Sequence, residues 1–234
     1  MLFTTAHELG HGVVRELELP VLGREEDAAD AFAITSGLSI GTEFSYRVLV
    51  EAAKGWFLSD RRAKKRGEML AYYDEHGMDL QRAYQIVCFM VGSDPNKYKD
   101  LAAETKLPKD RQESCQAEYR EALWSWQNAL KPHLRAADQP RQRIEVIYGE
   151  AKGDLEVFAR ANRDIHFLET VAEHVCDRIA WPRPFVIEMR TCGESGASWK
   201  ARRLTLCYEL AEEFAQLYYE FGGDRTVSNR KPKR

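Results

Sequence analysis

Two histidines and a glutamate near the start of the chain have the spacing of a metal site. His7 and His11 lie four positions apart in the segment His-Glu-Leu-Gly-His, so a helix would project both side chains from the same face. Two imidazole nitrogens on one helical face can bind a single Zn²⁺ ion. Glu8 lies on the adjoining part of the helix surface, where it can take a proton from an attacking water. The spacing predicts zinc ligands at His7 and His11 and a general base at Glu8.

An acidic segment follows and is expected to supply the third ligand. Catalytic zinc sites usually have three protein ligands and one open position. Glu26 lies fifteen positions after His11, and Asp30 lies four after Glu26 on the same face of an expected second helix. We predict Glu26 as the third ligand and Asp30 as the acceptor that fixes the tautomer of one ligand histidine. Glu25 and Asp27 are rival third ligands, because helical phase alone does not separate them from Glu26.

The histidine pattern also has a plain structural explanation. Such a five-residue pattern arises by chance in some chains of this length. His7 would then be a residue of a helix N-terminus, and His11 an ordinary histidine on a half-buried face. The Glu-x-x-x-Asp pair on the second helix favours the metal site over this alternative.

Composition limits the classes of protein that the chain can represent. Its 234 residues are enough for one large or two small domains, with 44% hydrophobic and 30% charged residues. The net charge of −3 argues against a nucleic-acid partner, and no apolar run approaches the ~20 residues of a membrane-spanning helix. The chain begins with Met-Leu-Phe-Thr-Thr rather than a signal peptide, so a cytoplasmic location is the expectation from its own sequence.

The five cysteines do not have the spacing of zinc ligands, since none forms a Cys-x-x-Cys pair. Cys192 and Cys207 flank an expected hairpin, where a cross-strand disulfide is geometrically plausible. Cys88 and Cys115 flank a loop-rich stretch, and Cys176 lies in a helical pattern typical of a buried thiol. Whether these pairs are oxidised depends on the compartment.

Hydrophobic periodicity predicts an α+β protein that is mostly helical with a small sheet. Helices are expected over 2–18, 25–34, 43–57, 80–91, 115–130, 155–179 and 209–221, and strands over 144–148, 185–189 and 203–208. Residues 1–135 form a helical part with the metal site, and residues 141–222 form a strand-bearing part. Residues 223–234 read as a disordered basic tail.

Two further segments carry polar groups of interest. Zinc peptidases need a donor for the tetrahedral oxyanion, and His76 is the best candidate downstream of the metal motif. Its structural alternative is a surface histidine beside two carboxylates. The basic run 60–66 is more typical of a solvated helix end than of a nucleic-acid surface.

With these residues in view, the chain resembles a bacterial family of zinc metallopeptidases with the His-Glu-x-x-His motif. The family carries His-Glu-Leu-Gly-His and then Leu-Pro-Val-x-Gly-Arg-Glu-Glu-Asp-Ala-Ala-Asp, found here at 7–11 and 19–30. The match continues through 74–76, 92–95 and Cys115, and 192–210 is similar to the family's cysteine hairpin. The resemblance implies a zincin-like, gluzincin-like domain, Zn²⁺ as cofactor and a peptide or protein substrate. Relatives look exported.

The order of the segments departs from the family, in which the strand-bearing part precedes the zinc helix. A zinc peptidase also needs a sheet edge near the metal to pair with an extended substrate, yet only six residues precede His7. We favour a circular permutation in which the strand-bearing part completes the same domain. The alternatives are two half-domains left from a tandem duplication, and a homo-oligomer that exchanges segments between protomers.

Two functions from different classes follow. The first is a zinc-dependent metallopeptidase with ligands His7, His11 and Glu26 and with Glu8 as general base. The second is a zinc-binding structural or interaction protein without hydrolysis, suggested by the altered segment 195–199 where relatives have Asn-Ala-Phe or Asn-Ala-Tyr. A third hypothesis makes the basic run an anion or nucleic-acid surface.

Overall fold

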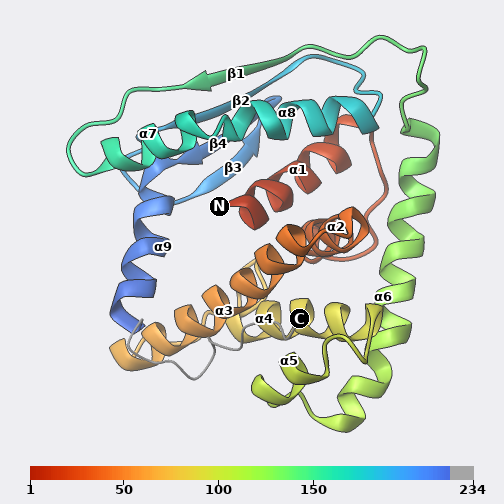
Figure 1. Cartoon of the computed structure of the whole chain (residues 1–234), viewed down its shortest axis with the longest axis vertical. Coiled ribbons are helices and arrows are strands. Elements are labelled where there is room, and N and C mark those ends of the chain that lie inside the picture. Colours follow the sequence, from red (N-terminus) through yellow and green to blue (C-terminus); the bar gives the residue numbers. More distant parts are fainter. Residues whose placement is uncertain (222–234) are drawn as a thin grey trace. The chain divides into compact units, whose positions relative to one another are not determined.

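The computed structural model describes residues 1–221, which divide into two units. Unit 1 comprises Met1–Ala33 and Ala122–Glu213, and unit 2 comprises Ile34–Glu121 with the described residues from Phe214 onward. The elements are labelled in Figure 1 and run in the order α1 (Leu2–Glu16), α2 (Glu25–Ile40), α3 (Glu43–Arg66), α4 (Asp79–Ser93), α5 (Lys99–Glu104), α6 (Lys109–Leu130), a 3-10 turn (Lys131–His133), β1 (Ile144–Tyr148), α7 (Leu155–Asp164), α8 (Phe167–Arg178), β2 (Phe185–Arg190), β3 (Ala197–Lys200), β4 (Arg203–Cys207) and α9 (Tyr208–Phe221).

Unit 1 is built on a four-stranded sheet with the strand order β1-β2-β4-β3. Strands β1, β2 and β4 are parallel, whereas β3 is antiparallel to β4 and forms an edge. Side chains alternate between the two faces of a strand, and three from β2 enter the core: Phe185, Ile187 and Met189. On the opposite face Glu188 accepts hydrogen bonds from Arg203 and Thr205. The sheet is thus apolar on one face and polar on the other.

Helix α1 covers part of the apolar face by packing against β3 and β4. Its residues Leu9 and Val13 share one buried cluster with Leu204 of β4 and with α8. A Cβ atom on Gly12 would lie 2.8 Å from three ring atoms of Trp199, so glycine permits the closest approach of helix and strand. This contact joins the start of the chain to residues that follow it by more than 180 positions.

The β3–β4 hairpin has a fixed register. Ala201 and Arg202 form its two-residue turn with φ of 49° and 58°, the left-handed conformation that type I′ hairpin turns require. Lys200 and Arg203 close the turn, so the next pair, Trp199 with Leu204, is a non-hydrogen-bonded pair. The N–H and C=O groups of Trp199 therefore point away from β4, toward the sheet edge.

Two further features fix the base of this hairpin. A disulfide joins Cys192 to Cys207. The Glu209 carboxylate, at the start of α9, accepts hydrogen bonds from the backbone N–H groups of Cys192 and Gly193 at 2.7–3.1 Å. The pairing that the sequence left open is thus present as a disulfide.

Unit 2 is centred on the packing of α3 against α4. The Thr42 side chain caps α3 by accepting a hydrogen bond from the Ser45 N–H, and the Ser45 hydroxyl accepts one from the Thr42 N–H. Leu49 and Ala53 of α3 are buried, and α4 is buried over most of its second half. A second disulfide joins Cys88 of α4 to Cys115 of α6, whereas Cys176 of unit 1 is a buried free thiol.

The α+β class expected from the sequence is confirmed, and several boundaries differ. Helix α2 continues to Ile40, beyond the expected end at residue 34. Gly37 does not end it, and a Cβ atom there would lie 3.3 Å from the Leu49 side chain, so this glycine allows close packing. Helix α3 extends through the basic run, in which Lys64 pairs with Asp60. The single helix expected over 155–179 is two helices, α7 and α8, because His166 has a φ of 51°.

Unit 1 combines the start of the sequence with its later, strand-bearing part. Helix α1 and the strands, which lie at opposite ends of the sequence, belong to the same unit. The circular permutation stays a prediction, and so does the division of the chain into 1–135 and 141–222. The predicted tail 223–234 lies outside the described residues. No helix within residues 1–221 is long and apolar enough to cross a membrane.

The packing at Gly12 predicts a sharp difference between two glycine substitutions. Gly12→Ala should destabilise the protein by about 1–3 kcal/mol, because the new methyl group meets the buried Trp199 ring. Gly55→Ala in α3 is the matched control, since nothing lies within 4 Å of its Cβ position, and it should stabilise by about 0.5–1 kcal/mol. Chemical denaturation measures both. Equal stabilities would contradict the close helix–strand contact.

The Glu209 carboxylate predicts a pH-dependent contribution to stability. Burial opposes its charge, but hydrogen bonds from its own N–H and from those of Gly193 and Cys192 outweigh this and lower its pKa below the usual 4.5. A lowered pKa in the folded state stabilises above about pH 4.5, and the contribution is lost as pH falls through the lower value. Glu209→Gln should therefore be less stable than the native chain at pH 7, by about 1 kcal/mol.

This difference should shrink steadily below pH 4, as denaturant midpoints at several pH values will measure. Glu212→Gln, one turn away in α9, serves as the control and should show no such trend. A difference that stays constant between pH 7 and pH 3 would exclude the charge on Glu209 as its origin.

Candidate metal centre

The two helices that carry the candidate ligands lie unusually close together. Gly10, within the His-Glu-Leu-Gly-His segment of α1, faces Ala29 of α2, and a Cβ atom at Gly10 would lie 3.0 Å from the Ala29 Cα atom. A larger residue at either position would separate the helices. The acidic first turns of α2 are thereby brought against the histidines of α1.

Three donor atoms converge between the helices. The Nε2 atoms of His7 and His11 lie 3.2 Å apart. Glu26 Oε2 lies 3.0 Å from the first nitrogen and 3.3 Å from the second. Both histidines are buried, and Glu26 is partly buried. The structure thus brings together the three side chains that the sequence grouped as ligands.

A second carboxylate lies behind each imidazole ring. His7 Nδ1 lies 2.7 Å from Asp30 Oδ1, and His11 Nδ1 lies 2.7 Å from Glu25 Oε1. When each Nδ1–H donates to its carboxylate, the neutral ring keeps an unprotonated Nε2. Asp30 thus occupies the place predicted for it, and Glu25 meets the far side of the His11 ring rather than the convergent donors.

This donor set fits a metal ion. Two Nε2 lone pairs and a carboxylate oxygen, all acceptors, would repel one another in a buried space unless a proton or a cation lay between them. Neutral imidazoles with back-bonded Nδ1 atoms are the usual histidine ligands of transition metals. Burial opposes the charged form of His11, but hydrogen bonds to Glu26 and Glu25 outweigh it and raise its pKa. The same negative surroundings would stabilise a bound cation.

Glu8 lies beside these donors and has the properties of a base. Its carboxyl is buried, and burial raises its pKa above the ordinary value, with the histidines acting in the opposite direction. The backbone N–H of Trp199 approaches the same carboxylate and lowers its pKa, which partly offsets the effect of burial. An edge strand of the sheet therefore lies beside the candidate base.

Arg15 is a polar neighbour that the sequence reasoning did not identify. Its Nε donates to Glu25 Oε1 at 3.1 Å, and its Nη1 donates to the Trp199 carbonyl at 3.0 Å. The helical spacing offered a signal, because Arg15 follows His11 by one turn. Trp199 offered none, because its contact with Arg15 spans 184 positions.

His76 belongs to unit 2, whereas the three convergent donors and Glu8 belong to unit 1. Its side chain is partly exposed, and its Nδ1 lies 3.1 Å from Asp74 Oδ1. This agrees with the surface histidine that the sequence offered as an alternative. The role in oxyanion stabilisation stays a prediction.

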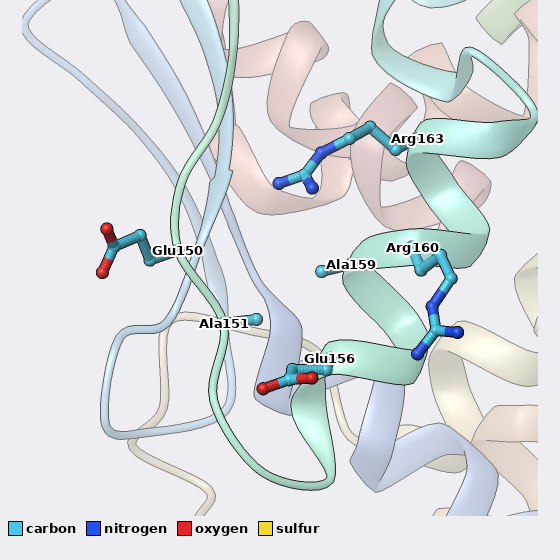
Figure 2. Close-up of a pocket in the computed structure, with 6 residues that line it drawn as sticks. All are labelled: Glu150, Ala151, Glu156, Ala159, Arg160 and Arg163. Atoms are coloured by element: carbon cyan, nitrogen blue, oxygen red, sulfur yellow. The ribbon is translucent and has the colours of Figure 1, made fainter.

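Other polar groupings among residues 1–221 are accounted for differently. Cys192, Cys207 and Glu209 are close enough to suggest metal ligands, but the two cysteines form a disulfide and have no thiolate to offer. A pocket of about 360 Å³ lies between α7 and the segment that follows β1, and Figure 2 shows the residues that line it. Its lining mixes two arginines with two glutamates, all exposed, and favours no single ligand charge.

Comparison with known proteins bears on the helical part of the chain. Residues 1–130 match a family whose description is "Putative metallopeptidase", which is more than half of the sequence. The match includes the three convergent donors and Glu8, and excludes all four strands. A metallopeptidase family implies a bound metal ion. No curated protein and no solved structure matches the chain.

The geometry predicts one metal ion per chain, with Glu26 as a direct ligand. In a titration of metal-free protein with Zn²⁺, Glu26→Gln should weaken binding by at least about 100-fold, since loss of an outer partner alone typically costs 10–100-fold. Asp27→Asn is the matched control, because Asp27 is exposed and pairs with Arg24 at 3.8 Å. Equal affinities of the two variants would exclude Glu26 as a ligand.

Proposed function

Because the chain belongs to this metallopeptidase family, we propose that it is a zinc-dependent peptidase of the His-Glu-x-x-His type. The convergence of His7 Nε2, His11 Nε2 and Glu26 Oε2 is the observation that carries the proposal. A tetrahedral ion with ligands at about 2.0–2.1 Å would set its donors about 3.3 Å apart. The observed separations of 3.0–3.3 Å support zinc with one position open to solvent or substrate.

The acid–base chemistry is proposed to depend on Glu8. A bound zinc ion would polarise the scissile carbonyl and make a water more acidic. Glu8 accepts the proton of the attacking water and passes that proton on to the leaving nitrogen. The Trp199 N–H approaches this carboxylate from the edge strand. Asp30 and Glu25 keep the ligand rings in the required tautomer.

The edge strand supports a peptide as the substrate. An extended peptide can add to an exposed sheet edge through main-chain hydrogen bonds. In β3 the Ala197–Leu206 pair, like Trp199–Leu204, is a non-hydrogen-bonded pair, so the N–H and C=O of Ala197 also point to the edge. Trp199 is engaged by α1, and Ala197 is therefore the proposed pairing point. His76 remains the predicted oxyanion donor.

Replacement of Glu8 tests the proposal directly. Glu8→Gln should bind zinc as the native chain does, because no ligand is lost and the amide oxygen can still accept the Trp199 N–H. Its kcat on a broad peptide library should fall by about 10²–10⁴-fold. Glu18→Gln, an exposed change just beyond the same helix, is the control and should keep full activity.

Two results would contradict the peptidase assignment. Hydrolysis that is unchanged in Glu8→Gln would assign the activity to another group. Zinc binding without any hydrolysis that depends on Glu8 would instead favour the second hypothesis, a metal-binding structural or interaction protein.

A further inference from the structure

Arg15 makes hydrogen bonds to two different elements beside the candidate centre. Its guanidinium donates through Nε to Glu25 and through Nη1 to the Trp199 carbonyl. One acceptor belongs to the helix behind a ligand histidine, and the other belongs to the edge strand. Arg15 itself touches none of the three convergent donor atoms.

We call the contact from Arg15 to Glu25 the first arm and the contact from Arg15 to Trp199 the second arm. The first arm acts on the candidate ligand His11. The same oxygen, Glu25 Oε1, receives both Arg15 Nε and His11 Nδ1, the latter at 2.7 Å. The Glu25 side chain is 33% exposed, so without Arg15 its carboxylate could rotate into solvent. Arg15 therefore holds the acceptor that fixes the orientation of the His11 ring.

The second arm acts on the candidate base. The Trp199 C=O accepts a hydrogen bond from Arg15, and the Trp199 N–H approaches the Glu8 carboxylate, so both polar groups of one strand residue face α1. Gly12, between them, lies under the Trp199 ring. Positions 8, 12 and 15 form one stripe along the helix, and this stripe fixes the strand in one register beside the metal donors.

We propose that Arg15 is a positioning residue of the candidate peptidase centre, which orients His11 through Glu25 and Glu8 through Trp199. The reaction-related half of this proposal rests on the proposed function. An arginine suits the task because its planar fork carries donors in fixed, divergent directions. A lysine at this position would reach one acceptor at a time.

The test compares Arg15→Gln with Arg183→Gln in the full-length chain. Arg183 is a close match: its side chain is 55% exposed against 52% for Arg15, and it pairs at 3.0 Å with Glu16 of the same helix. Arg15→Gln should weaken Zn²⁺ binding by about 10-fold. At saturating Zn²⁺ it should also lower kcat by about 10-fold with KM little changed, because Arg15 does not contact the substrate. Arg183→Gln should change neither.

A double-mutant cycle separates the two arms. In a Glu25→Gln background, Arg15→Gln should no longer affect Zn²⁺ affinity, because the first arm is already broken. Its effect on kcat should persist, since the arm through Trp199 is intact in that background. Free guanidinium ion added to Arg15→Ala should restore part of kcat, and added to Arg183→Ala should not.

A readout without metal or substrate keeps the test independent of the proposed function. Amide hydrogen exchange of Ala197–Lys200 in metal-free protein should be faster in Arg15→Gln than in the native chain and unchanged in Arg183→Gln. Equal exchange in all three proteins overturns the proposal even if the native chain is an active peptidase. Faster exchange in Arg15→Gln, if the native chain lacks peptidase activity, supports the role of Arg15 in holding β3. It then contradicts only the proposed peptidase function.

Discussion

The convergence of two buried imidazoles on one carboxylate oxygen is the interaction on which unit 1 depends. Three acceptor atoms within 3.3 Å of one another are unfavourable without a positive charge between them. The surrounding side chains favour a cation between these three acceptors. Asp30 and Glu25 supply the negative charge that favours a cation, and they direct the ring protons away from it. The close packing at Gly10 keeps the two helices near enough for the arrangement to exist.

The parts of this centre that the sequence predicted are those that local geometry determines. His7, His11, Glu26 and Asp30 all lie on two neighbouring helices, where a separation of three or four residues specifies a face. Helical phase did not separate Glu25 from Glu26 as the third ligand. Adjacent helical residues differ by about 100° in direction, so either side chain could have reached a histidine. The structure distinguishes them by the ring nitrogen that each approaches.

The parts that the sequence did not predict depend on contacts between distant segments. Strand β3, Ala197–Lys200, is too short to show alternation, and its register is set by a turn of Ala201 and Arg202 that carries neither glycine nor asparagine. The break between α7 and α8 likewise carried no glycine or asparagine signal, since it falls at His166, which has a positive φ. The contact of Trp199 with Arg15 and Glu8 had no local signal at all. The presence of the helices could be predicted from the sequence. Which strand edge lies against α1, the helix that carries His7 and His11, could not.

The distance in sequence between α1 and β3 has a consequence for how the protein is made. All three convergent donors lie within the first 26 residues, so they can gather as soon as α1 and α2 have left the ribosome. The strand residue beside Glu8 is number 199, and the hairpin that orders it ends at Cys207. Under the proposed function, metal capture can therefore precede placement of the base until β3 has been synthesised. On that proposal, a nascent chain would hold its ion before it could act as a peptidase.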